Sequence, residues 1–410
     1  MATTTTGVKT GMKTPLIIHD LQGSQMFSLA QAAGRAGIPV EGTSWPMEGW
    51  AKKSRYIQRA VKLQCLSEQL KGTYALGLKN TELSGVWLPC VDDIASFTSH
   101  YQGLLRKMGM RFITADVEAM EASFLTEKLP ETSTLKIAPG EIVRIGDLYE
   151  NAEKYLFPLM IKSERDRFQK FADPAALRHF LKSQDVEKHP DERERVQQFI
   201  EGDIDKMASA LILFDDDSRP VRGFTCRRLR VAESEFGPFG ETTAAKAEWI
   251  PELYEGACEM LSAIKWKGFA EVECKQGVDG QWYIMEMNPR LSGWSVLAEA
   301  DGAGMLSAYY QMCAEGAKLE EACLQRSRAE YVRMIATCYH EPDWAVERNG
   351  NRTFLSHLRQ LFMIIRDYRK KRPDMILGAW DDLDLPASLS IFYKTLQNVW
   401  KRKRIKREYP

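Results

Sequence analysis

The first third of the chain alternates between short apolar runs and segments with helical spacing. The run PLIIH (15–19) is followed by FSLAQAAGRAG (27–37), in which small and apolar residues recur at helical spacing before a glycine, and then by the strand-like IPVEGTSW (38–45). The pattern continues with a helix around 61–70, a strand at 85–93, a helix at 94–109 and a strand at 110–116. Strands that alternate with helices predict a parallel α/β unit.

The pattern changes after residue 118. A buried-looking strand, LFPLMIKS (156–163), is followed by the helix-like DPAALRHFLKSQ (173–184) and by the strand VQQFIEG (196–202). Two antiparallel hairpins are then predicted, one pairing 206–214 with 219–231 through the turn residues DDDS and one pairing 268–275 with 281–288, with an amphipathic helix at 249–266 between them. Beyond about 311 the chain is predicted to be mostly helical, so the expected fold class is α/β with mixed α+β parts.

These changes divide the chain into parts with different expected structures. We expect a disordered N-terminus at 1–13, a Rossmann-like domain at 14–118 and a helical C-terminal region with a basic tail at 311–410. The middle part, 119–310, is expected to form a small lobe at about 119–200 and a large lobe at about 201–310. The first domain contains no GxGxxG, so its fold alone does not indicate a dinucleotide.

Composition narrows the function classes. The chain has 410 residues, of which 44% are hydrophobic, and its 56 Lys and Arg residues are balanced by 56 Asp and Glu residues. This balance excludes a basic field over the whole chain, so we expect no nucleic-acid partner. The sequence contains no run of about 18 apolar residues that could form a membrane-spanning helix.

Cysteine and histidine usage gives no metal or disulfide signal. The eight cysteines are scattered without a CxxC, which is typical of reduced thiols and not of a disulfide framework or a zinc site. The six histidines show no metal-ligand spacing, although His19 ends the first predicted strand. The N-terminal MATTTTGVKTGMK lacks the apolar segment of a signal peptide. We therefore expect a cytoplasmic protein.

The charge is concentrated at the C-terminus. Residues 351–410 contain 14 Lys or Arg and 6 Asp or Glu, with basic runs at RDYRKKR (366–372) and KRKRIKR (401–407). One interpretation is a solvated tail. The other is a patch that contacts an anionic membrane surface or another anionic partner. The amphipathic IFYKTLQNVW (391–400) likewise fits either a packing helix or a helix that lies on a membrane or partner surface.

The second hairpin carries the most informative polar residues. Because alternate side chains of a strand point the same way, Glu286 and Asn288 share a face, and Glu273 on the partner strand can face them, with Glu271 on the same side. Carboxylate and amide oxygens are the ligands that magnesium prefers. Arg290 follows at the strand end, where a guanidinium could grip a transferring phosphoryl group. The alternative is a solvated strand face that happens to be acidic.

This hairpin resembles the magnesium-binding hairpin of the ATP-grasp superfamily. The likeness is carried by EVECK (271–275) and DGQWYIMEMNPRLSG (279–293), an acidic residue on one strand and E-x-N-x-R on the next. It extends over roughly residues 14–310 and is closest to carboxylate–amine ligases related to D-aspartate ligase, through AGIPVEGTSW, SRYIQRAV, WLPCVDD and FTCRRLR. The resemblance implies a Rossmann-like domain in front of a two-lobed ATP-grasp domain. It also implies ATP and one or two Mg²⁺ ions as cofactors.

The resemblance also implies roles for individual residues. FPLMIKS is similar to the strand with the ATP-binding lysine, which makes Lys162 that residue. VQQFIEGDID is similar to the hinge strand, where the backbone of Phe199 and Ile200 would bind adenine. Because the segment after Lys162 contains no glycine, Lys170 is expected to supply charge to the phosphates. The remaining candidates are Gln197 or Gln198 at the hinge, Asp205 for the ribose, and Glu273, Glu286 and Asn288 for the metal.

The implied reaction is the ATP-dependent joining of a carboxylate to an amine through an acyl phosphate. Arg290 would steady the acyl phosphate. Arg228 and Arg230, two apart on one predicted strand, would grip a carboxylate or phosphate unless they form an exposed basic face. Both substrates would be small molecules, with an amino acid expected as one of them, and the resemblance suggests a homodimer. The alternative is a nucleotide-binding protein without ligase activity that acts through interactions.

Overall fold

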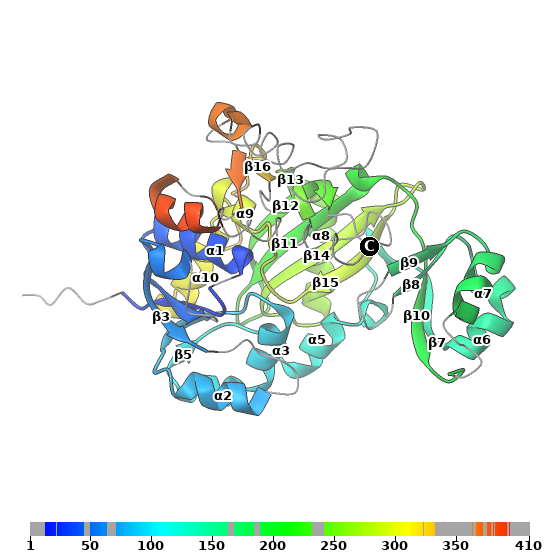
Figure 1. The fold of residues 1–410 in the computed structure, drawn as a ribbon, viewed down its shortest axis with the longest axis horizontal. Coiled ribbons are helices and arrows are strands. Elements are labelled where there is room, and N and C mark those ends of the chain that lie inside the picture. Colours follow the sequence, from blue (N-terminus) through cyan, green and yellow to red (C-terminus); the bar gives the residue numbers. More distant parts are fainter. Residues whose placement is uncertain are drawn as a thin grey trace, which may run out of the picture.

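The computed structural model describes most of the chain up to residue 332 and short segments beyond it. The described residues are 13–21, 23–44, 50–63, 71–162, 168–183, 189–231, 242–322, 324–332, 363, 366–371, 375–378, 380, 382–391 and 393. They form three sheets, which lie one after another along the long axis of the molecule (Figure 1).

The N-terminal part is a parallel sheet covered by helices on both faces. Its strand order is β3-β2-β1-β4-β5, with all neighbours parallel. The strands are β1 (Leu16–Ile18), β2 (Val40–Ser44), β3 (Ile57–Lys62), β4 (Gly85–Leu88) and β5 (Met110–Arg111). The helices are α1 (Ser24–Arg35) on one face and α2 (Lys71–Lys79), α3 (Asp92–His100) and α4 (Gln102–Lys107) on the other. This arrangement is the Rossmann-like sheet that the apolar pattern predicted.

One predicted element of this part lies mostly outside the described residues, and its first two positions belong to a strand. The helix expected around 61–70 is preceded by β3, which continues to Lys62, and α2 begins only at Lys71, while residues 64–70 lie outside the described part. β3 pairs in parallel with β2 from Ile57 to Lys62. This pairing gives the backbone of 57–62 its hydrogen bonds, and a local pattern of residues does not reveal it.

The central part is a large, mostly antiparallel sheet. Its order is β17-β16-β13-β12-β11-β14-β15-β6 among the described residues. The strands are β6 (Leu135–Ile137), β11 (Met207–Phe214), β12 (Pro220–Val231), β13 (Thr242–Ala247), β14 (Gly268–Gln276), β15 (Trp282–Asn288), β16 (Glu330–Val332) and β17 (Met375–Leu377). Both predicted hairpins are present, as β11–β12 and β14–β15. Helix α8 (Pro251–Ala263) packs on one face of this sheet through an apolar core of its own.

The other face of the large sheet packs toward the N-terminal part. One continuous core joins strand residues such as Leu211 and Phe224 to Leu29 of α1 and to the helices that follow β15. These helices are α9 (Val296–Ala300) and α10 (Met305–Tyr310), followed by a π-helical turn at Gln311–Glu315. Helix α5 (Val117–Ser123) connects the first two sheets. One face of the large sheet is therefore covered by α8, and the other packs against the N-terminal part.

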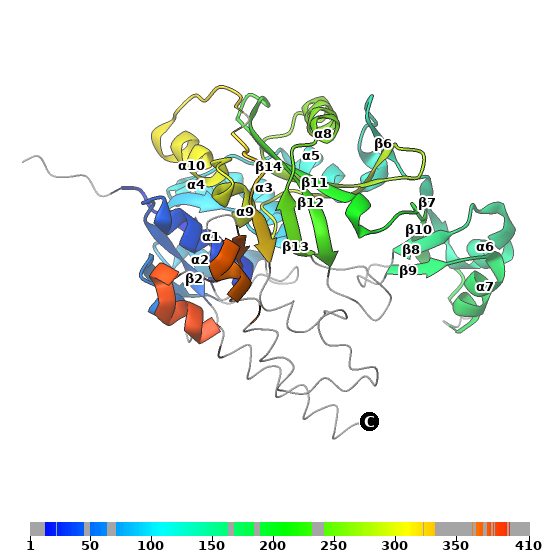
Figure 2. The same ribbon diagram turned by 90° about the horizontal axis from the view of Figure 1, so that it is seen from above.

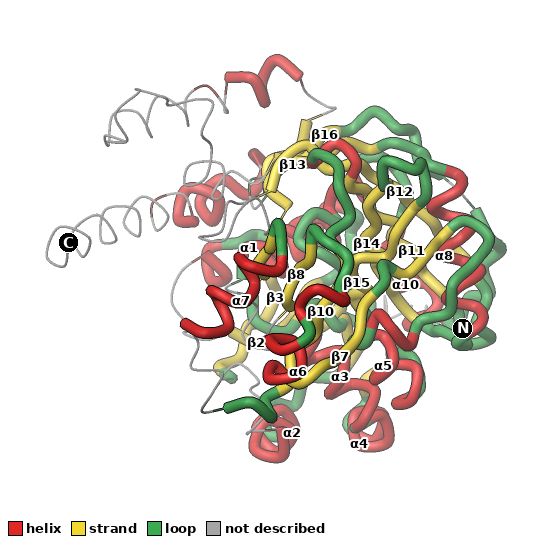
Figure 3. Tube along the Cα trace, turned by 90° about the vertical axis from the view of Figure 1, so that its right-hand side faces the viewer, coloured by secondary structure: helices red, strands yellow, loops and turns green. Residues whose placement is uncertain are grey.

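A small antiparallel sheet projects from the rest (Figure 1), and Figure 3 views the molecule from this end. Its order is β7-β10-β8-β9, made of β7 (Gly140–Arg144), β8 (Leu159–Lys162), β9 (Phe168–Phe171) and β10 (Arg193–Gln198). Helices α6 (Ile145–Glu150) and α7 (Pro174–Ser183) share an apolar core with these strands. This is the small lobe in the descriptions that follow, and strand β8 and helix α7 match the elements predicted there.

The described residues of the C-terminal region form two short strands as well as the predicted helices. Its described residues include β16 and β17, which extend the large sheet, besides helical residues at 366–371 and 385–391. Asp384 is fully buried and accepts hydrogen bonds from the Ser54 hydroxyl at 2.6 Å and the Arg55 amide at 2.9 Å. This segment therefore lies against the N-terminal part, beside α1 (Figure 2). The basic run 401–407 and most of 391–400 lie outside the described residues.

No helix among the described residues is long and apolar enough to cross a membrane.

Candidate functional site

The acidic residues of the β14–β15 hairpin lie on one face, as strand alternation predicted. Glu271 pairs with Asn288 and Glu273 pairs with Glu286, so all four side chains leave the same side of the sheet. A register shift after Glu273 leaves Met285 as an extra residue in β15. Apolar residues on this same face of the sheet, such as Leu211, pack against the N-terminal part.

Glu271 is the most buried carboxylate of this group. It accepts hydrogen bonds from Trp294 Nε1 at 2.9 Å, Asn288 Nδ2 at 3.1 Å and the Ser292 hydroxyl. Burial, followed by the charge of Glu273, raises the pKa of Glu271 to about 7. Because Ser292 and Trp294 belong to the loop after β15, Glu271 fixes that loop and the Asn288 amide on the acidic face. The sequence identified Glu271 but did not indicate these partners.

Arg228 of β12 lies beside the acidic pair. It is 5% exposed, forms an ion pair with Glu273, and its Nε finds no hydrogen-bond partner among the described residues. The Ser209 hydroxyl of β11, opposite Glu273 in the sheet, is also buried without such a partner there. Buried polar atoms are normally paired in a folded protein, so two such atoms beside a carboxylate indicate a place where a ligand completes the network.

Arg230 does not share a face with Arg228, contrary to the expectation from their spacing. Arg228 lies opposite Ala245 and Arg230 opposite Ala244, with a register shift between them. Because Ala244 and Ala245 are adjacent on β13, their side chains point to opposite faces. The extra residue at Leu229 reverses the alternation. Arg228 therefore joins the acidic face, and Arg230 lies on the other one.

Arg290 connects the acidic hairpin to the N-terminal part. Its Nε and Nη2 donate to the two carboxylate oxygens of Asp92, at 2.9 and 3.1 Å, and Nη2 also donates to Asn288 Oδ1 at 3.0 Å. The Gln25 amide donates to the Leu291 carbonyl at 2.9 Å and so holds the adjoining backbone. An amide oxygen has a second acceptor position, so the bond from Arg290 leaves one on Asn288 for a metal.

The predicted hinge residues lie between the two lobes. The Phe199 amide donates to the Pro158 carbonyl at 2.8 Å, and Ile200 is buried. Gln197 Nε2 donates to the Ala138 carbonyl at 3.3 Å, while its buried Oε1 has no partner among the described residues. Gln198 is half-buried at the end of β10. Asp205 is exposed, and its backbone carbonyl accepts a hydrogen bond from Arg227.

Two lysines contact the Phe199 ring. Lys170 Nζ of β9 lies 3.9 Å from the ring centroid, and Lys275 Nζ of β14 lies 4.7 Å from it. Burial, followed by the charge of Lys170, lowers the pKa of Lys275. The sequence singled out Lys170 as a candidate and did not single out Lys275, although Lys275 lies two residues beyond Glu273 on the same face. The backbone of Lys162 belongs to β8, and its side chain lies outside the described part.

The candidate metal ligands are two carboxylates and an amide. Among the described residues no group of three or more Asp, Glu, His or Cys side chains is arranged to hold a metal ion. The set Glu273, Glu286 and Asn288 contains only two such side chains, and its third member is an amide. Its hard oxygen atoms suit magnesium, which keeps several positions for water and phosphate oxygens.

His19 is buried at the carboxyl end of β1. Its Nδ1 lies 2.7 Å from the Tyr74 hydroxyl and 3.3 Å from the Thr43 hydroxyl. Burial lowers the pKa of His19 to about 4. The imidazole is therefore neutral near pH 7 and belongs to the packing of the N-terminal part.

His19 makes the stability of the protein pH-dependent. In the unfolded chain His19 titrates near its ordinary value, so between about pH 6.5 and about pH 4 the unfolded state binds the extra proton. Its contribution is complete above this interval and is lost as the pH falls through it, by about 3 kcal/mol in total. Urea unfolding at about pH 7 and about pH 4.5 measures the loss, which should be smaller in His19→Gln than in the wild type. Equal losses would contradict the assignment.

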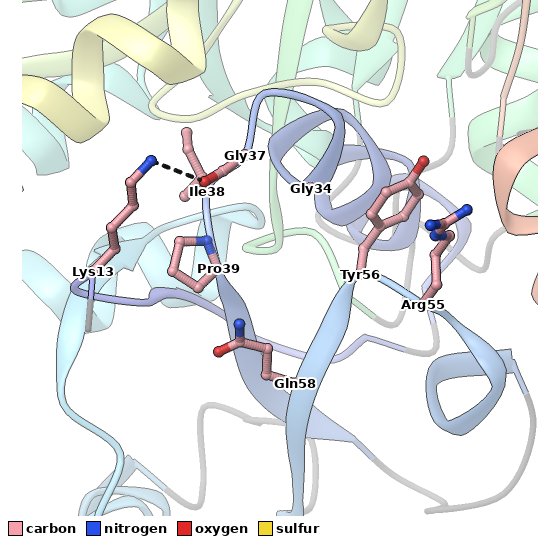
Figure 4. A pocket seen from close by; sticks show the side chains of 8 residues that line it. All are labelled: Lys13, Gly34, Gly37, Ile38, Pro39, Arg55, Tyr56 and Gln58. Atoms are coloured by element: carbon pink, nitrogen blue, oxygen red, sulfur yellow. Dashed lines mark hydrogen bonds between the residues drawn. The ribbon is translucent and has the colours of Figure 1, made fainter. Parts of the chain in front are cut away.

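A cavity of about 460 Å³ lies elsewhere, at the amino ends of β2 and β3. Figure 4 shows Lys13, whose Nζ reaches the Gly37 carbonyl, on one side and Tyr56 and Arg55 on the other. In open α/β sheets, ligands bind at the carboxyl ends of the strands. The carboxyl end of β4 leads to Asp92 and hence to Arg290. The acidic face is therefore the better candidate for the main site.

Comparison with solved structures places this geometry in a known fold. The biotin carboxylase domain of the 2-oxoglutarate carboxylase from Hydrogenobacter thermophilus, with MgADP, ADP and bicarbonate, is 15% identical, covers 78% of this chain and 74% of its own, and has a TM-score of 0.57. The L-amino acid ligase from Bacillus licheniformis is 17% identical over 76% of each chain, with a TM-score of 0.54. N5-carboxyaminoimidazole synthetase from Staphylococcus aureus is 13% identical, with 75% and 78% covered and a TM-score of 0.52.

These three are ATP-grasp proteins, and the chain has the ATP-grasp fold that the resemblance predicted. At such low identity the likeness describes the fold. No protein-family model and no curated protein matches the sequence.

Proposed function

We propose that this protein is an ATP-dependent, ADP-forming ligase that joins a carboxylate to an amine. The observation that carries the proposal is the acidic face of β14 and β15, where Glu273, Glu286 and Asn288 lie together beside the buried Arg228 and the half-buried Arg290. Oxygen ligands flanked by guanidinium groups suit a magnesium-bound triphosphate and the phosphoryl group that leaves it. The fold supports this reading, since the solved neighbours include a carboxylase domain with MgADP and an L-amino acid ligase.

In this proposal the substrates are two small molecules, a carboxylate and an amine, one of them an amino acid. The carboxylate oxygen attacks the γ-phosphorus of ATP, ADP leaves, and an acyl phosphate results. The amine nitrogen then attacks the acyl carbon, phosphate leaves, and the nitrogen loses a proton. Such chemistry asks the protein mainly to position the reactants and to stabilise charge.

The residues divide this work among them. Glu273, Glu286 and Asn288 would hold one or two Mg²⁺ ions, which supply positive charge to the phosphates when bound. Arg290 would contact the transferring phosphoryl group, with its guanidinium plane fixed by Asp92. Arg228 would bind the substrate carboxylate or the phosphate with its unpaired Nε. Arg230, on the opposite face, has no part in this scheme.

The nucleotide would lie across the lobes. Lys162 and Lys170 would contact the phosphates from the small lobe, and the backbone of Phe199 and Ile200 would bind the base beside Gln197 or Gln198. The Phe199 amide is already bonded to Pro158, so the contact with the base falls to the Phe199 carbonyl and to Ile200. Asp205 would take the ribose. A homodimer is part of the proposal, in line with the dimer of the carboxylase neighbour.

A screen of carboxylates against amines tests the proposal. We expect ADP release that requires ATP, magnesium, one carboxylate and one amine together, and that is lost in Glu286→Gln. The product should contain the new amide, detected by mass spectrometry. ATP binding without ADP release over a broad panel would contradict ligase activity and favour a nucleotide-binding protein that acts through interactions.

A further inference from the structure

Lys275 occupies a position on the acidic face that the roles above leave unexplained. It follows Glu271 and Glu273 at alternate positions of β14, so its side chain leaves the same face as theirs. The residue is 7% exposed. Its Nζ lies 4.7 Å from the centroid of the Phe199 ring, which Lys170 of the small lobe approaches to 3.9 Å. Two ammonium groups from different lobes thus meet at one aromatic ring.

The positive charges of Lys170 and Lys275 repel each other, so the contact with the ring does not by itself explain why both lysines are there. An ammonium group can donate three hydrogen bonds, and Lys275 Nζ donates none and forms no ion pair within the described ranges. The acidic residues that act on it electrostatically, Asp203 and Glu201, are exposed. The charge of Lys170 opposes that of Lys275. One ammonium group is enough for a cation–π contact with the ring. Two ammonium groups repel each other, and an anion placed between them would offset that repulsion.

The order of residues along β14 indicates which anion this would be. Successive alternate positions lie about 7 Å apart along a strand, so Lys275 follows the metal ligand Glu273 by one such step, on the side of the hinge residue Phe199. If the nucleotide is bound as proposed above, its outer phosphates lie at Glu273 and Glu286 and its base lies beside the hinge. The phosphate that is attached to the ribose then lies between them, opposite Lys275.

We propose that Lys275, together with Lys170, binds the ribose-linked phosphate of the nucleotide and so joins the two lobes around it. This inference rests on the proposed function, because it places the nucleotide in the same cleft. It assigns to the large lobe a contact with the ribose-linked phosphate, in addition to the metal ligands and the two arginines. Lys275 also gives the cleft a preference for nucleotides over nucleosides that does not depend on magnesium.

Calorimetric titration with adenosine, AMP and ADP, each with and without magnesium, separates this role from others. In Lys275→Met the apolar stem is kept and the charge is removed. We expect AMP and ADP to bind about 10-fold more weakly or worse, because a charge-assisted hydrogen bond is lost, while adenosine binding changes less than about 2-fold. Lys275→Arg should restore most of the AMP affinity. Lys246→Met is the matched control and should behave as the wild type, because Lys246 of β13 is half-buried and pairs with Glu248.

Each remaining outcome has a distinct meaning. Wild-type affinity for AMP and ADP in Lys275→Met, with the wild type itself binding them, would overturn the inference and leave the proposed function intact. A parallel loss of adenosine and AMP would also overturn it, since Lys275 would then support the hinge and not the phosphate. Absence of nucleotide binding by the folded wild type would refute the proposed function, and this inference with it. If Lys275→Met does not fold, the exposed Lys170→Met should show the same selective loss of AMP and ADP at a smaller size, and unchanged AMP binding there would overturn the inference.

Discussion

Replacing Glu286 by glutamine is expected to lower the affinity of the protein for Mn²⁺ about 100-fold in the presence of ADP. Mn²⁺ accepts the same oxygen ligands as Mg²⁺ and is visible by electron paramagnetic resonance. Glu286 lies opposite Glu273 in the hairpin, and its side chain is exposed on the acidic face. Glutamine keeps its size and removes the negative charge.

The matched control for this measurement is Glu118→Gln. Glu118 is an exposed carboxylate in the first turn of α5, and its removal should leave the Mn²⁺ titration unchanged. If Glu286→Gln and the wild type bind Mn²⁺ equally well with ADP present, the hairpin is not the metal site. The acidic face would then be the solvated surface that the sequence allowed as an alternative.

Replacing Arg228 by methionine is expected to destabilise the fold by about 3 kcal/mol or more. Arg228 is 5% exposed and pairs with Glu273, whose side chain is 16% exposed, so the change leaves a carboxylate uncompensated next to Glu271. Removing one partner of a buried pair costs much more than removing one partner of an exposed pair. The free energy of unfolding in urea measures the loss.

Arg219→Met provides the comparison for this experiment. Arg219 lies in the turn before the same strand, and its side chain is 63% exposed in pairs with Asp215 and Asp217. Its replacement should change the free energy of unfolding by less than about 1 kcal/mol. Equal effects of Arg219→Met and Arg228→Met would contradict the account of Arg228 as the buried counter-charge of the acidic face.

The acidic face could be predicted from the sequence because it depends on a local rule. Alternation along β15 places Glu286 and Asn288 together, and a short turn brings Glu273 opposite. The same rule failed for Arg228 and Arg230, because the register shift between them reverses the alternation. The sequence FTCRRLRV (224–231) contains no residue pattern that predicts this register shift. It arises from pairing with β13, and it removes one of two arginines from the candidate site.

The contacts that fix the site could not be predicted, because they join residues far apart in the chain. Arg290 is held by Asp92 across a separation of 198 positions, and Lys275 meets Lys170 only at the ring of Phe199. The strands β16 and β17 are three residues long and depend on the edge of an existing sheet. Local patterns predict an element well when its apolar residues recur at a regular spacing, as in α8. They predict it poorly when the element forms only because it pairs with a neighbouring strand.

The central claim is that the face formed by Glu273, Glu286 and Asn288 binds a magnesium-bound nucleotide. The most direct test is calorimetric titration of ATP into the wild type and into Glu286→Ala. Each titration is carried out with magnesium and again after the magnesium has been removed by chelation. The account predicts one nucleotide per chain, tight binding only with magnesium, and no gain from magnesium in the variant. A folded wild type that binds no ATP, or a variant that keeps the full magnesium dependence, would contradict it.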